Sequence, residues 1–142
     1  GLLFRDEADR ILIVDPTYKD HWEIPGGVVE ADESPRQAAV RETAEELGLQ
    51  IDAGPLQPIC IDYSHATDAR PEALMFVFDS GRLSEERIAD ICLPDDELAD
   101  FRFAPLQEAR ALLGDILGPR VDRCIDALAE GTCRYHEVAL EN

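Results

Sequence analysis

The sequence contains no long apolar run and few basic residues. No stretch approaches the roughly 20 consecutive apolar residues that a membrane-spanning helix needs. Thirteen Lys and Arg residues stand against 31 Asp and Glu residues, which gives a formal net charge of −18. This deficit argues against nucleic acid and an anionic membrane surface as partners, because both require a basic footprint. It does not exclude a small anionic substrate, because a bound divalent cation can reverse the local field.

The four cysteines lack the close spacing of a zinc site. None of them forms a C-x-x-C pair. Three of them, Cys60, Cys92 and Cys124, lie among apolar residues and are predicted to be buried free thiols. Free thiols persist in a reducing compartment, so we expect a cytoplasmic protein.

The chain also lacks internal repeats, low-complexity tracts and linkers. Its 142 residues are the size of one domain and 45% of them are apolar, so residues 1–142 are predicted to form a single domain. The chain opens on Gly1 and not on Met. We therefore expect residues to be missing before it, with a removed targeting signal among the alternatives.

Apolar and β-branched runs predict several strands and a mixed architecture. The predicted strands are residues 10–14, 59–63, 73–79, 88–93, 101–104 and 132–138, of which 73–79 is nearly continuously apolar and therefore central. Strands and helices follow one another without regular βαβ alternation. The predicted fold class is therefore α/β or α+β, with a mixed sheet sandwiched between helices.

Three helices are predicted, and the first has clear start and stop signals. Ser34 suits the N-cap, Pro35 suits the first helical position and Gly48 ends the helix. The other two are expected at residues 105–113 and 119–130, each beginning at a proline.

The first helix carries three carboxylates on one face. Glu42, Glu45 and Glu46 stand at i, i+3 and i+4, where like charges repel by a few tenths of a kcal/mol per pair. A solvated acidic face is the ordinary interpretation of such a pattern. A divalent cation is the competing one, because hard oxygen ligands suit magnesium or manganese. The Gly26-Gly27 turn favours the cation, because its backbone can approach a ligand closely.

The segment 27–49, GVVEADESPRQAAVRETAEELGL, resembles the Nudix box. That box is a glycine, five residues, Glu, seven residues, Arg-Glu, an apolar residue, one residue, Glu-Glu, one residue, Gly and an apolar residue. The matching positions are Gly27, Glu33, Arg41, Glu42, Glu45, Glu46, Gly48 and Leu49. Thr43 departs from the pattern at an apolar position, and its β-branched methyl makes the departure minor.

The resemblance implies a Nudix fold whose active site is a loop-helix-loop motif. It implies that Glu45 and Glu46 bind metal and that Glu42 is a further ligand or the catalytic base. The carbonyl of Gly26 is a further expected ligand. The expected cofactor is Mg²⁺, with Mn²⁺ as an alternative.

The resemblance also implies supporting residues around these ligands. Glu33 and Arg41 are expected to form an ion pair that holds the loop against the helix, with Arg41 counted in the catalytic set. Gly27 belongs to the same supporting layer. Many family members add an acidic residue from a later loop as ligand or base, and here Asp95, Asp96 and Glu97 precede a predicted strand. Glu97 is the preferred candidate.

The expected activity is magnesium-dependent hydrolysis of a diphosphate linkage in a nucleoside diphosphate derivative or a nucleoside triphosphate. The alternative is a catalytically inactive Nudix-like module that binds a nucleotide as a sensor; an acidic interaction domain is a third hypothesis. The substrate-binding residues are unknown from the sequence. Trp22, Tyr63 and Phe76 can stack on a base, but packing is the favoured interpretation of each. The expected partner is a small-molecule nucleotide, and a homodimer is left open.

Overall fold

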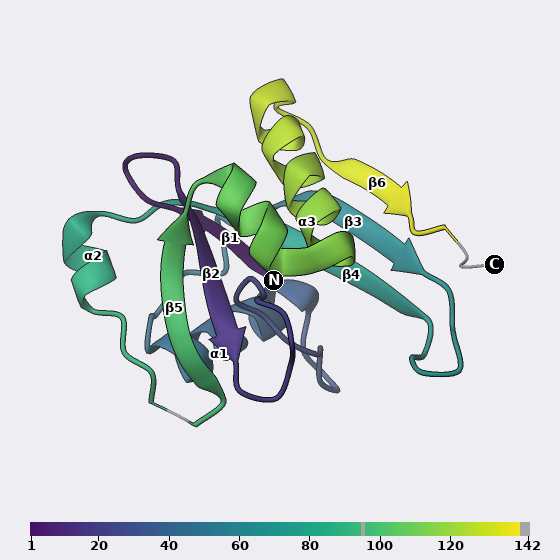
Figure 1. The fold of residues 1–142 in the computed structure, drawn as a ribbon, viewed down its shortest axis with the longest axis horizontal. Coiled ribbons are helices and arrows are strands. Elements are labelled where there is room, and N and C mark those ends of the chain that lie inside the picture. Colours follow the sequence, from purple (N-terminus) through teal and green to yellow (C-terminus); the bar gives the residue numbers. More distant parts are fainter. Residues whose placement is uncertain (95, 140–142) are drawn as a thin grey trace.

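The computed structural model describes residues 1–94 and 96–139, in which six strands form one mixed sheet (Figure 1). The strand order is β5-β2-β1-β4-β3-β6. β1 pairs with β4 and β3 pairs with β6 in parallel, while the other neighbours are antiparallel. The strands are β1 (Leu2–Arg5), β2 (Ile11–Pro16), β3 (Gln57–Ser64), β4 (Ala73–Arg82), β5 (Leu98–Ala104) and β6 (Arg134–Glu137).

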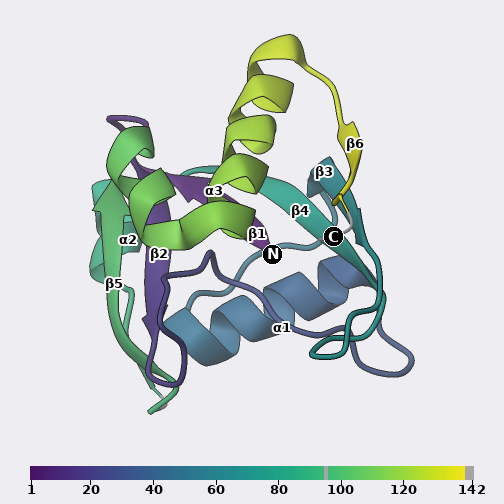
Figure 2. The same cartoon turned by 45° about the vertical axis from the view of Figure 1, so that its right-hand side comes forward.

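Helices cover both faces of this sheet. α1 (Pro35–Leu47) crosses one face and α3 (Leu106–Glu130) lies on the other, while the short α2 (Glu85–Ala89) stands at one side (Figure 2). Successive strand residues point to opposite faces, so Leu2 joins the core beneath α1 and Leu3 joins the core beneath α3. The predicted sandwich of helices around a mixed sheet is confirmed.

The ends of α1 follow the predicted signals. The Ser34 hydroxyl accepts from the Gln37 backbone N–H at 3.2 Å, and the Gln37 side chain accepts from the Ser34 N–H at 2.8 Å. This reciprocal pair is a capping box, which satisfies two otherwise unpaired donors. Gly48 ends the helix at φ 67°, a conformation that costs glycine little. The carboxylates of α1 therefore project from a helix whose two ends are held by capping interactions.

The two predicted C-terminal helices form one bent element. Gly114 has non-helical backbone angles inside α3, which separates the predicted helix 105–113 from the predicted helix 119–130. Pro119 lies just after this bend, where its missing N–H is tolerated. None of the helices formed by residues 1–94 and 96–139 is both long and apolar enough to cross a bilayer.

One predicted strand needs correction, and one strand of the structure was not predicted. The strand predicted at 88–93 is wrong, because Ser84 caps a helix instead and its hydroxyl accepts from the Arg87 N–H at 3.2 Å. The apolar residues Ile88 and Ile91 of this segment pack on the core beneath α1 without joining the sheet. β1 (Leu2–Arg5) was not predicted, although it pairs in parallel with β4 at the centre of the sheet.

The cysteine prediction holds for two of three residues. Cys60 and Cys124 are fully buried free thiols, as expected. Cys92 is exposed; it lies in the irregular segment after α2, where its backbone N–H donates to the Leu47 carbonyl at 3.0 Å. Cys133, for which no burial was predicted, is exposed as well.

Candidate active site

The Gly-Gly turn rests directly on the carboxylates of α1. A Cβ atom on Gly27 would lie 2.3 Å from Cδ of Glu42, so a larger residue at this position would displace the Glu42 carboxylate. The Gly26 backbone N–H donates to Oε1 of Glu46 at 3.2 Å. The turn and the helix therefore enclose Glu42 and Glu46 between them, as the box predicts for a loop against a helix.

Glu46 is the most buried of the three helix carboxylates. Its exposed fraction is 8%. Its pKa is raised to about 8, mainly by burial; the hydrogen bond from Gly26 lowers the pKa, and the charge of Glu42 adds to the rise. Burial also raises the pKa of Glu42, and the hydrogen bond from Arg41 opposes this shift. A buried carboxylate with so little compensation is suited to a cation, since a cation would stabilise its charged form.

Glu45 lies apart from these two carboxylates. Its side chain is 50% exposed and its Oε2 lies 3.4 Å from Nη1 of Arg41. Within residues 1–94 and 96–139, no three His, Cys, Asp or Glu side chains are arranged to hold a metal ion. Glu45 therefore has to turn away from Arg41 before it can join Glu42 and Glu46 as a ligand.

Arg41 ties the loop to the helix. Its Nη2 donates to Oε1 of Glu33 at 2.7 Å and its Nε donates to Oε2 at 3.0 Å, a bidentate pair. Nη2 also donates to the Val28 carbonyl at 3.1 Å, and Nη1 donates to Glu42 at 3.0 Å. The hydrogen bonds from Arg41 lower the pKa of Glu33 to about 2. The predicted ion pair between Glu33 and Arg41 is present, and its supporting role stays a prediction.

Glu33→Gln is expected to lower turnover by about tenfold to a hundredfold, the usual effect of losing a group that orients a ligand. The loop then loses a charged partner for Arg41, which also contacts Glu42. Steady-state kinetics with a nucleotide substrate measures the change. Glu30→Gln is the matched control, because Glu30 is 69% exposed and lies 3.7 Å from the same guanidinium. Equal losses in both variants would contradict the positioning role.

Two further acids lie near the buried carboxylates. The charges of Glu23 and Glu97 both raise the pKa of Glu46, and Glu97 also raises that of Glu42. The Glu97 carbonyl accepts from the Thr17 N–H at 3.0 Å, which fixes this loop before β5. Sequence reasoning missed Glu23, although it lies only three residues before Gly26. Asp95, which belongs to the same acidic run as Glu97, lies outside the described residues.

The aromatic candidates have packing partners. Trp22 is half-buried and the Arg102 guanidinium lies 4.9 Å from its ring centroid. Phe76 stacks on Phe78 at 6.4 Å, and the Tyr63 hydroxyl donates to Glu72. These contacts support the packing interpretation of all three rings.

Comparison with known proteins agrees with this geometry. A family model described as the NUDIX domain matches residues 1–123. A MutT-like protein from Streptomyces ambofaciens is 31% identical over 125 residues, which cover 85% of this chain and 78% of that protein. Diphosphoinositol polyphosphate phosphohydrolase 3-alpha of Mus musculus is 36% identical over 87 residues, 60% of this chain and 51% of that protein, so the chain matches about half of this relative.

The fold agrees as well. The crystal structure of a C. elegans Ap4A hydrolase binary complex has a TM-score of 0.68 at 20% identity, covering 92% of this chain and 97% of that chain. At this identity the likeness shows the fold alone. Together with the family match, it establishes that the chain belongs to the Nudix family, whose members are hydrolases of pyrophosphate bonds in nucleotide derivatives. Enzymes of this family generally use divalent metal ions.

Proposed function

We propose that this chain hydrolyses a diphosphate linkage in a nucleoside diphosphate derivative or a nucleoside triphosphate with the aid of Mg²⁺. The observation that carries the proposal is the buried Glu46 carboxylate, which is held against the Gly26 N–H and has its pKa raised to about 8. Such a group is costly unless a cation accompanies it. Mn²⁺ suits the same oxygen ligands and is the alternative ion.

The donors around the turn fit such an ion. The carboxylates of Glu42, Glu45 and Glu46 and the carbonyl of Gly26 would hold it. When bound, Mg²⁺ would neutralise and orient the diphosphate, whose charge otherwise repels a nucleophile. Arg41 and Glu33 keep the loop at the distance from α1 that these ligands need. Phosphoryl transfer depends mainly on such positioning and charge stabilisation.

A base is needed to accept the proton of the attacking water, and two residues are candidates. Glu97 lies on the exposed loop before β5, and its charge acts on Glu42 and Glu46. Glu42 is the alternative, but it contacts Arg41 and the turn, which suits a ligand better. We therefore assign the base role to Glu97.

Glu97→Gln is expected to lower kcat by about a hundredfold to ten-thousandfold, the range for loss of a positioned general base. The expected change in KM is small, because the amide preserves the shape of the side chain. Asp96→Asn, the neighbouring exposed acid, is the control and should retain activity. Full activity of the Glu97 variant would contradict Glu97 as the base and favour Glu42 in this role.

The activity itself is tested with a panel of nucleoside diphosphate derivatives and nucleoside triphosphates, each assayed with Mg²⁺ and with chelator. Turnover of at least one free nucleotide, abolished by chelator, supports the proposal. Tight binding without any turnover would favour the alternative, an inactive nucleotide sensor. The complete set of box glutamates argues against that alternative. Decapping of RNA without activity on any free nucleotide would contradict the proposed substrate class.

Two further features belong to the proposal. A cytoplasmic location is supported by four free thiols, which are typical of a reducing compartment. A homodimer stays a prediction. The molecular mass of the protein in solution would give its oligomeric state.

A further inference from the structure

A buried carboxylate beneath α3 binds two arginines. Asp62 of β3 is fully buried, and its Oδ2 accepts from Nε of Arg120 at 2.7 Å and from Nη2 of Arg123 at 2.5 Å. Its other oxygen accepts from the Cys60 thiol at 3.1 Å. The Arg120 side chain is only 6% exposed and that of Arg123 is 18% exposed. Three charged side chains thus lie together largely out of water.

This cluster has more donors than acceptors. Each guanidinium carries five N–H donors, and the contacts with Asp62 occupy one nitrogen of each arginine. Nε of Arg123 is buried and has no hydrogen-bond partner among the described residues. Two positive charges also face one negative charge, in a protein whose net charge is −18. A buried cation whose charge and N–H donors are incompletely paired is costly, and an added anionic group would offset this cost.

The Arg110–Asp122 ion pair on the same helix provides a comparison, because one arginine there pairs with one aspartate. Nε and Nη2 of Arg110 donate to a single aspartate oxygen at 2.9 and 2.6 Å. One arginine meets one aspartate, so the charges balance. Asp62 meets two arginines instead, so its cluster carries one more positive charge than the Arg110–Asp122 pair.

The cluster lies at the same level of the sheet as the Gly-Gly turn. Asp62 stands opposite Met75 on β4. The carbonyl of the next residue, Phe76, accepts from the Gly1 nitrogen at 2.7 Å, and the following residue of β1, Leu2, donates to the Pro25 carbonyl at 2.8 Å. The path from Asp62 to the turn thus crosses from β3 to β4, from β4 to residues 1–2, and from there to Pro25. These three steps amount to about 14 Å at the usual distance between paired strands.

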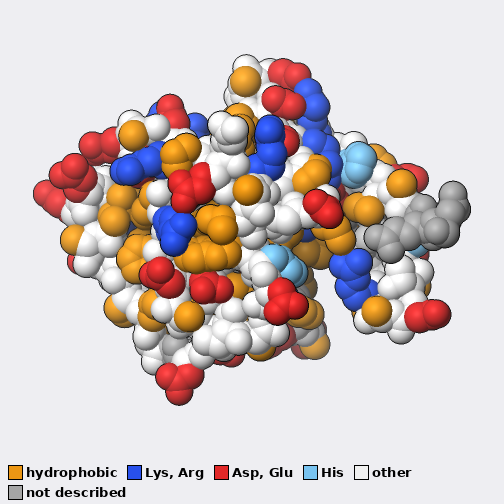
Figure 3. Space-filling model, in the orientation of Figure 1, with side chains coloured by type: hydrophobic (Ala, Val, Ile, Leu, Met, Phe, Trp, Pro, Cys, Tyr) orange, Lys and Arg blue, Asp and Glu red, His pale blue; other side chains and the backbone are white. Residues whose placement is uncertain are grey.

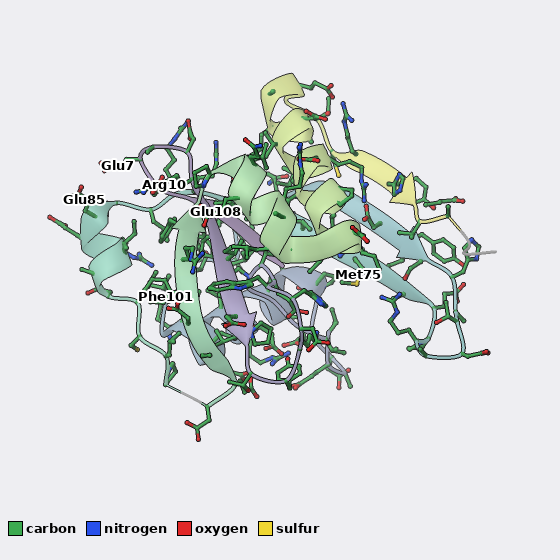
Figure 4. All side chains as sticks on the ribbon, viewed as in Figure 1. Glu7, Arg10, Met75, Glu85, Phe101 and Glu108 are labelled. Carbon is green, nitrogen blue, oxygen red and sulfur yellow. The ribbon has the colours of Figure 1, made fainter. Side chains whose placement is uncertain are left out.

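Residues at the edge of the cluster are accessible to solvent. Met75 is 41% exposed and lies beside the bend of α3 (Figure 4). Basic side chains and a histidine gather between α3 and β6 (Figure 3). The register of β6 places His136 next to Asp62, so a third side chain with ring or guanidinium N–H groups borders the cluster.

We propose that Arg120 and Arg123, positioned by Asp62, bind a phosphoryl group of the substrate that is remote from the diphosphate cleaved at the Nudix box. This inference rests on the proposed function and extends it to substrates with an additional phosphate. A single phosphate cannot touch both sites, because they are separated by three strand spacings. Asp62 orients the two guanidinium groups, which offer their remaining N–H donors to phosphate oxygens. The cluster would thereby favour more highly phosphorylated substrates.

Binding of inorganic phosphate tests the site without metal or turnover. Calorimetry is carried out with chelator at fixed ionic strength on wild type, Arg123→Gln, Arg123→Lys and the control Arg110→Gln. Wild type and the Arg110 variant should bind equally. Arg123→Gln should bind about tenfold to a hundredfold more weakly, the effect of losing a charged hydrogen bond, and Arg123→Lys should recover part of the loss. Arg123 is the position changed because removing Arg120 would leave Asp62 poorly paired.

The same measurement separates this proposal from the hydrolytic one. Glu46→Gln should retain phosphate binding, because the box does not form this site. Absent binding in wild type, or equal binding by wild type and Arg123→Gln, would overturn the phosphate site and leave the hydrolase assignment standing. Retained phosphate binding in a chain that hydrolyses no nucleotide would support the site while contradicting the proposed function.

Kinetics then connects the site with the substrate. Diadenosine tetraphosphate and diadenosine diphosphate share their nucleosides and differ in two phosphates. Arg123→Gln should raise KM for the tetraphosphate about tenfold or more with little change in kcat, and should leave the diphosphate unaffected. Equal effects on both compounds, or a loss confined to kcat, would overturn the assignment of a remote phosphate.

Discussion

Replacing Glu46 by Gln is expected to lower nucleotide hydrolysis by at least about a hundredfold, because losing a group that merely orients a metal ligand already costs tenfold to a hundredfold. Glu46 is buried against the Gly26 N–H and Glu42 lies beside it, so no exposed acid can take its place without moving the turn. The amide oxygen can still accept from Gly26, and the fold should therefore persist. Initial rates at saturating Mg²⁺ and circular dichroism measure both outcomes.

Glu86→Gln is the matched control, because Glu86 is an exposed acid in the first turn of α2. It should leave turnover unchanged. Undiminished turnover in a folded Glu46 variant would remove the basis of the site assignment, since the remaining box carboxylates lie nearer the surface. An equal loss in both variants would point to general charge effects instead of a specific ligand.

The metal-free protein is expected to lose stability as the pH rises from about 5 to 8. The folded-state pKa of Glu46 is about 8, against 4.5 for its ordinary value. The folded state therefore holds a proton that the unfolded state has released in this interval, so the free energy of unfolding falls as pH rises. The loss is on the order of a few kcal/mol, at about 1.4 kcal/mol per pKa unit.

Denaturant unfolding with chelator at pH 5.5 and pH 8 measures this dependence. Glu46→Gln has no ionisable group at this position, so it should be less sensitive to pH than wild type and more stable at pH 8. Mg²⁺ should reverse the wild-type loss, because it binds the folded site and favours the charged carboxylate. At a hundredfold excess over its dissociation constant, the gain is about 2.7 kcal/mol. Equal pH dependence in both proteins would show that Glu46 is charged without metal.

Glu45→Gln determines whether the exposed carboxylate joins the metal site. If Glu45 turns from Arg41 to the ion, the variant should gain less stability from Mg²⁺ than wild type. Repulsion by its neighbours and attraction to Arg41 oppose each other, so its metal-free stability should change by only a few tenths of a kcal/mol. Melting curves with chelator and with Mg²⁺ test this. An equal Mg²⁺ gain in both proteins would exclude Glu45 as a ligand.

Local patterns determined the helix and the box. Ser34, Pro35 and Gly48 specify the ends of α1 through backbone capping, which depends on residues a few positions away. The spacing of Glu42, Glu45 and Glu46 and the adjacent glycines follow from the chain itself. The family and its chemistry could be inferred from the residues alone, because these interactions are contained in one continuous segment.

Elements with little local signal were harder to predict. β1 has four residues, too few for a periodic pattern to distinguish a strand from other apolar segments. The segment 88–93 has a strand-like composition, but the Ser84 cap and its place beside α1 make its first part helical. Its apolar side chains serve the core in either conformation. Tertiary packing decided between them.

Only the tertiary structure decided which acidic side chains are buried and which charged groups lie near them. Glu45 differs from Glu46 by one position, yet Arg41 holds the first at the surface while the turn buries the second. Glu23 approaches Glu46 because the chain leading into the turn pairs with Val14 of β2. The sequence by itself determined the chemistry of the box through short-range spacing.

The cluster of Asp62, Arg120 and Arg123 beneath α3 could not be predicted from the sequence. Asp62 lies 58 positions before Arg120 and 61 before Arg123, and the three residues form no recognisable motif. Their meeting depends on the register of β3 and on the bend that lays the second half of α3 over that strand. Burial and charge balance are properties of this packed arrangement. They arise when the sheet and helix enclose the three side chains, so composition and spacing carry no signal for them.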